Sequence, residues 1–135
     1  MSPERIAVYV VVFLVFVLFV FNVYRKIPKR LKTRNYVKKW RDIQKLFSNK
    51  EDWAHAIVHA DMLLDEVMCR KKINGKTMGE RLVNIQDRFS VHESVWNAHK
   101  LAGAIRQEGS RQMSEEEVKN TLVAFRQALR DLGAL

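Results

Sequence analysis

The sequence has one cysteine, Cys69, in 135 residues, which excludes a disulfide within the chain. A lone thiol suits a reducing compartment, and we expect Cys69 to be a small apolar filler on a helix. No segment alternates apolar and polar residues with the period of two that a half-buried strand needs, and repeats and low-complexity tracts are absent. These absences predict an all-α protein.

Charge is missing from residues 6–23, IAVYVVVFLVFVLFVFNV, which are apolar or aromatic apart from Asn22. As a helix this run spans about 27 Å, close to the roughly 30 Å hydrocarbon thickness of a bilayer. It therefore predicts a transmembrane helix over 5–24, which Pro28 ends or kinks. The alternatives are a buried core helix and a cleaved signal peptide, but the latter has a shorter apolar region and small residues at its cleavage site.

Acidic residues are scarce directly behind this run. Residues 25–45 hold ten Lys or Arg against Asp42, whereas residues 46–135 carry thirteen basic and thirteen acidic groups. The basic residues nearest the run are Arg25, Lys26, Lys29, Arg30, Lys32 and Arg34. By the positive-inside rule this side is cytoplasmic, so we predict a single-pass protein with its N-terminus outside.

The basic segment has three interpretations, which the residues leave open. Its charges set the orientation of the span and do nothing more, or they bind anionic lipid at about 1 kcal/mol per cation near the surface. Alternatively, they hold RNA by neutralising its phosphates.

The remaining sequence predicts a small antiparallel helical bundle. Residues 25–47 comprise the basic segment and a first cytoplasmic helix from about 33, and residues 48–135 form the bundle. Four capping boxes, Ser or Thr followed three residues later by Glu, announce helix starts: SNKE at 48–51, TMGE at 77–80, SVHE at 90–93 and SEEE at 114–117. The helices that follow are expected over about 49–72, 78–88, 91–107 and 115–132.

A metal site would require more ligands than the chain offers in one place. His55 and His59 lie one helical turn apart, but AIV separates them where a HExxH motif would supply a glutamate. Both fall opposite the apolar stripe of their helix. We therefore expect them to be exposed to solvent and expect no metal.

Five charged residues are candidates for a polar network. Asp61 and Asp65, one turn apart near the edge of an apolar stripe, are expected to pair with Arg81 or Arg106 rather than to act as an acid–base pair. His99 and Arg106, seven residues apart, fall on the inward side of the fourth cytoplasmic helix and need partners there. They predict either a structural network with Asp61 or Asp65 or the floor of a polar groove.

Three stretches carry a resemblance: GKTMGERL at 75–82, VWNAHKL at 95–101 and the tail at 114–135. Together they resemble a group of uncharacterised bacterial single-pass membrane proteins, whose cytoplasmic part is similar to the HEPN superfamily of helical bundles. HEPN ribonucleases carry an RNxxxH motif, and the group reads HKLRNxIAHE where this chain reads HKLAGAIRQE. Ala102, Gly103 and Gln107 thus occupy the positions of the motif's Arg, Asn and His.

The resemblance implies a HEPN-like domain without its catalytic residues. Ala102 has no charge to stabilise a phosphorane, and Gln107 cannot exchange a proton near neutral pH. It implies a bacterial inner-membrane protein with no cofactor, while the small surface at 102–104 predicts a homodimer. We expect an interaction module that recruits a protein or RNA. The alternatives are a membrane-tethered ribonuclease that uses His99 and Arg106, and a structural subunit of a membrane complex.

Overall fold

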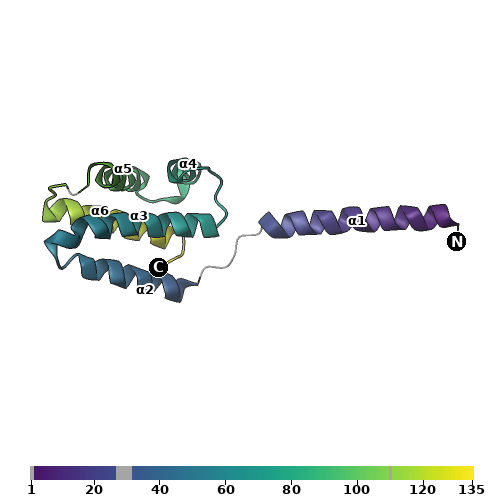
Figure 1. The fold of residues 1–135 in the computed structure, drawn as a ribbon, viewed down its shortest axis with the longest axis horizontal. Coiled ribbons are helices and arrows are strands. Elements are labelled where there is room, and N and C mark those ends of the chain that lie inside the picture. Colours follow the sequence, from purple (N-terminus) through teal and green to yellow (C-terminus); the bar gives the residue numbers. More distant parts are fainter. Residues whose placement is uncertain (1, 27–31, 110) are drawn as a thin grey trace.

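The structure, a computed structural model, describes residues 2–26, 32–109 and 111–135 (Figure 1). Within these residues there are helices and no strands, as predicted from the sequence. The helices are α1 (Pro3–Lys26), α2 (Thr33–Leu46), α3 (Trp53–Arg70), α4 (Met78–Asn84), α5 (His92–Glu108) and α6 (Glu115–Asp131), with short 3-10 helices η1 (Lys50–Asp52) and η2 (Gln86–Arg88).

The first helix, α1, stands apart from the others (Figure 1). Its 24 residues extend about 36 Å, and none of its apolar stretch is buried against the rest of the chain. It is long and apolar enough to span a membrane. At its end the Arg25 guanidinium lies 5.7 Å from the centre of the Phe21 ring. Pro28, Lys29 and Arg30 lie outside the described residues, as does the side chain of Lys26.

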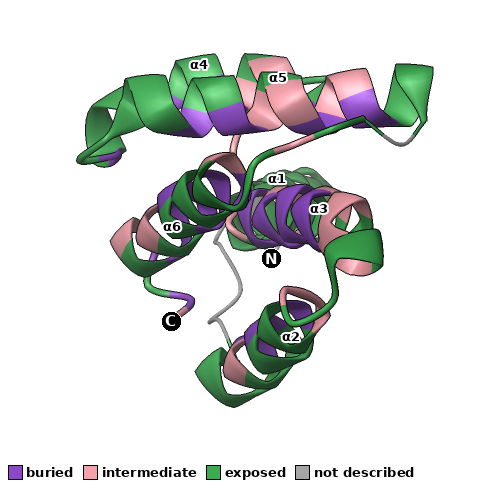
Figure 2. Ribbon diagram, turned by 90° about the vertical axis from the view of Figure 1, so that its left-hand side faces the viewer, coloured by how far each residue is buried: buried purple, intermediate pink, exposed green. Residues whose placement is uncertain are grey.

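The central helix of the bundle is α3, which packs against α2, α5 and α6. The apolar faces predicted for the helices meet here (Figure 2). The largest fully buried apolar side chains are Phe125, Ile57, Leu64, Met68, Leu129, Leu132, Val67, Val95 and Val118. Val91, the N-cap residue of α5, lies exposed just before the helix begins.

The topology differs from the predicted antiparallel bundle. α2 runs antiparallel to α3, but α3 and α6 run in the same direction (Figure 1), while α4 and α5 lie across them (Figure 2). The physical reason is that α4 and α5 return the chain to the end of the bundle where α3 begins. Residues 111–114, just before α6, accordingly share a groove with residues 50–54.

At two of the four predicted capping boxes the Ser or Thr side chain caps the helix. Thr77 and Ser114 accept hydrogen bonds from the backbone N–H groups of Glu80 and Glu117, at 3.2 and 3.1 Å. The other two predictions were wrong. Ser48 is followed by η1, so that α3 begins only at Trp53, without a side-chain cap.

Ser90 does not cap α5 because it bonds elsewhere. Its backbone N–H and its hydroxyl both donate to Oδ2 of Asp131, each at 2.9 Å. Gln127 donates to the other carboxylate oxygen at 3.0 Å. Burial raises the pKa of Asp131, but these hydrogen bonds outweigh it and the pKa is lowered overall. The carboxylate thus joins the start of α5 to the end of α6.

The Asp131→Asn variant is expected to be less stable than the wild type by about 1 kcal/mol near neutral pH. Because the folded-state pKa of Asp131 is lowered, its contribution is complete above the unfolded-state pKa and is lost as pH falls through the folded-state pKa. The difference between the two proteins should therefore shrink below about pH 4. Urea unfolding at a series of pH values measures this, and a difference that is independent of pH would contradict it.

Candidate functional site

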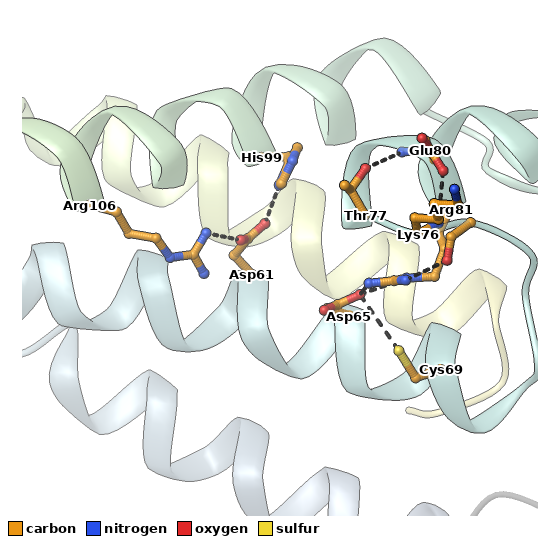
Figure 3. A network of polar contacts seen from close by, with 10 residues as sticks. Asp61, Asp65, Cys69, Lys76, Thr77, Glu80, Arg81, His99 and Arg106 are labelled. Atoms are coloured by element: carbon orange, nitrogen blue, oxygen red, sulfur yellow. Dashed lines mark hydrogen bonds and ion pairs between the residues drawn. The ribbon is translucent and has the colours of Figure 1, made fainter.

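A buried carboxylate lies at the contact between α3 and α5. Asp61 is 0% exposed, and Oδ1 and Oδ2 accept hydrogen bonds from His99 Nδ1 at 2.8 Å and Arg106 NH1 at 2.7 Å (Figure 3). The predicted network of His99 and Arg106 with Asp61 is therefore confirmed. The predicted place of Asp61 near the edge of the apolar stripe was wrong, because α5 crosses over this part of α3 and covers the carboxylate.

The charges of this cluster balance within it. A buried carboxylate is costly unless it is both hydrogen-bonded and paired. Arg106 neutralises Asp61, and the carboxylate fixes the ring of His99, whose Nδ1 donates when the imidazole is neutral. The side chain of His99 is 20% exposed and that of Arg106 is 40% exposed, so their outer edges reach the surface. Trp96 covers His99, with 5.9 Å between ring centres.

The second aspartate makes a separate pair. Asp65 Oδ1 accepts from Arg81 Nε at 2.9 Å and from Arg81 NH2 at 2.6 Å, and Arg81 NH1 donates to the Gly75 carbonyl at 2.9 Å. These bonds attach α4 and the turn before it to α3 (Figure 3). A Cβ at Gly75 would lie 2.7 Å from the Arg81 backbone nitrogen, which explains the glycine at this position.

The three positions of the HEPN motif do not form a site. Ala102 is 0% exposed and faces the core, Gly103 has open space where a Cβ would be, and Gln107 is exposed on the last turn of α5. Neither His99 nor Arg106 lines any of five well-defined grooves on the described residues. The polar groove that was the alternative prediction for them is thus not found among those grooves.

Comparison with protein-family models finds no match. Comparisons with curated proteins and with solved structures find no significant relative either. The site is therefore interpreted from its own geometry.

The remaining candidates lie on the surface. His55 and His59 are exposed, with 6.5 Å between ring centres, as predicted. Among the described residues no group of three potential metal ligands occurs. Cys69 was predicted to be an apolar filler but is exposed at the end of α3, 3.9 Å from Asp65 Oδ1. Lys32 and Arg34, at the start of α2, are exposed.

Two features of the surroundings were not predicted. Lys39 on α2 pairs with Glu66 on α3 at 2.8 Å. The indole N–H of Trp40 is buried without a hydrogen-bond acceptor among the described residues. The sequence indicates only that Trp40 belongs to an apolar face, because the fate of its N–H depends on how α2 docks onto the bundle.

Proposed function

We propose that the chain is a membrane-anchored interaction module whose helical bundle lies in the cytoplasm and recruits a protein partner to the membrane surface. The observation that carries this proposal is the exposure of α1. Its Val, Leu and Phe side chains contact nothing else in the described chain, and an apolar surface of this size is unfavourable in water. A bilayer supplies the missing apolar surroundings, and the basic residues after α1 favour a cytoplasmic bundle.

An interaction role also agrees with the Asp61 cluster. Its carboxylate uses both oxygens inside the bundle. At the HEPN motif positions, Ala102 has no charge to stabilise a phosphorane and Gln107 cannot exchange a proton near neutral pH. We further propose self-association of the HEPN-like bundle through α5, where Gly103 and Ala104 leave a small, half-exposed surface. Confinement to a membrane plane would reinforce such a dimer by raising the local concentration.

A second candidate function is an RNA-cleaving site built from His99 and Arg106. The observation in its favour is that Asp61 holds an imidazole and a guanidinium side by side, with His99 Nε2 unused among the described residues. Full-length protein incubated with single-stranded RNA tests this candidate. It requires cleavage that is lost in both His99→Ala and Arg106→Ala, whereas the recruiting module predicts no cleavage by any of the three proteins.

The lone cysteine provides a test of membrane position. Cys69 is exposed in the bundle, so a membrane-impermeant maleimide should label it only after expressing cells are permeabilised. The matched control combines Cys69→Ser with Ser2→Cys, which should be labelled in sealed cells. Labelling of Cys69 in sealed cells would refute the orientation. A mature chain that lacks residues 6–23 by mass spectrometry would refute the anchor.

A further inference from the structure

A groove of about 200 Å³ separates α2 from α6. It is lined by Trp40, Gln44, Phe47, Lys119, Leu122, Val123 and Arg126. α2 packs on α3 and not closely on α6. Of the apolar side chains that line the groove, Trp40 and Leu122 are buried, whereas Phe47 is only partly buried. Val123 is the most open of them, at 56% exposure.

The groove is cationic. Lys119 and Arg126 line it and no carboxylate does, whereas the four other well-defined grooves each include at least one Glu or Asp. Neither cation forms an ion pair with a residue that the structure describes. Charge complementarity therefore calls for an anionic occupant.

The floor of the groove contains an unsatisfied donor. Trp40 is only 6% exposed, and within the described chain its Nε1–H has no acceptor. An unpaired buried donor is unfavourable, and native proteins leave few of them. An occupant that brings a carbonyl or carboxylate oxygen to Nε1 would satisfy this N–H.

The size and spacing of the groove indicate what kind of anion fits. A volume of about 200 Å³ is below the usual range for small-molecule sites and suits one or two apolar side chains. One stripe along α6 carries Lys119, Val123 and Arg126, because these residues are spaced by four and then three positions. The two cations on this stripe are about 10 Å apart along the helix. A bound amphipathic helix presents its own anchors at the same spacing, so a helix laid along α6 can match this stripe.

We propose that the groove between α2 and α6 is the docking site for an acidic amphipathic helix of a protein partner. The helix inserts one apolar side chain beside Trp40 and Val123 and places carboxylates on Lys119 and Arg126. This proposal rests on the recruiting function proposed above and names the surface that performs it.

The probe for the test is a display library of random peptides, panned against the full-length protein in nanodiscs of phosphatidylcholine, which has no net charge. The expected result is enrichment of peptides that combine Asp or Glu with one large apolar residue. Binding should weaken at least about tenfold in the double variant Lys119→Glu with Arg126→Glu. The single variant Arg126→Glu should weaken binding in the same direction. Arg130→Glu is its matched control, because it makes the same charge change one turn beyond the groove and should leave binding unchanged.

The outcomes separate the groove from the wider function. If the peptides bind the double variant as tightly as the wild type, the groove is not their docking site. That result would still support recruitment through another surface. Enrichment of peptides without acidic residues, or no enrichment at all, would overturn the proposal that the groove binds an acidic helix. Cys69 labelling tests the membrane anchor independently of these results.

The indole resonance of Trp40 gives a direct readout at the site. We expect the enriched peptide to shift this resonance in NMR spectra and to leave the indole resonance of Trp96, which lies on α5 away from the groove, unaffected. Trp40→Phe retains an aromatic ring without the donor and should weaken binding several-fold while the bundle stays folded. A Trp40 shift that appears without peptide when phosphatidylglycerol replaces phosphatidylcholine would assign the groove to lipid headgroups and overturn the proposal.

Discussion

Asp61→Asn is expected to lower the free energy of unfolding of the bundle by about 3 to 5 kcal/mol. The substitution keeps the shape of the side chain but removes the charge that Arg106 neutralises. Its amide N–H has an acceptor at His99 only when the imidazole changes to the tautomer whose Nδ1 carries no proton. At 0% exposure, water cannot take the place of the lost partner. A bundle of this size is stable by roughly 5 to 10 kcal/mol, so the variant should lose about half of its stability.

Asp65→Asn is the matched control for this prediction. Asp65 lies one turn further along α3 and also pairs with an arginine, but its side chain is 34% exposed against 0% for Asp61. Solvent therefore compensates in part, and we expect a loss of about 1 kcal/mol. All three tryptophans lie in the bundle, so urea unfolding followed by their fluorescence reports the bundle without a signal from α1. Equal losses in the two variants would contradict the role assigned to burial.

The helices themselves were largely predictable because hydrophobic periodicity is a local property. Val118, Leu122, Phe125 and Leu129 recur at helical spacing, and the structure buries all four on α6. The capping pattern was less reliable, since it identifies a possible acceptor without its competitors. Ser90 bonds to the distant Asp131, and no reading of residues 90–93 alone reveals that carboxylate.

The residues of the candidate site could be predicted from the sequence, but their pairing could not. Helical projections place His99 and Arg106 on an inward face, but they do not show where α5 crosses α3. That crossing decides that a single carboxylate, Asp61, receives both side chains, and that Arg81 takes Asp65. The groove beside Trp40 was not predicted for the same reason, because it exists only where α2 and α6 stop short of each other.

Introducing the residues of the HEPN motif is expected to destabilise the bundle rather than to activate it. The triple variant Ala102→Arg with Gly103→Asn and Gln107→His should lose 3 kcal/mol or more, chiefly through Ala102→Arg, as an order-of-magnitude estimate for overpacking plus a buried charge. Ala102 is 0% exposed, so the new guanidinium would need a buried partner. Asp61 is the one buried carboxylate of the described core, and its two oxygens already accept hydrogen bonds from His99 and Arg106. Urea unfolding measures the expected loss of stability, and an RNA-cleavage assay measures the expected absence of activity.

Gly103→Arg is the control that shows whether the loss of stability comes from burial at position 102 or from the arginine side chain itself. It introduces the same side chain one residue along α5, where a Cβ meets no atom within 4 Å, and arginine favours a helix over glycine by up to about 1 kcal/mol. We therefore expect Gly103→Arg to be as stable as the wild type or more so. If the triple variant is instead stable and cleaves RNA, the core around Ala102 must open to admit a guanidinium. That result would support the resemblance to HEPN ribonucleases, because an active site would then need only three substitutions to reappear.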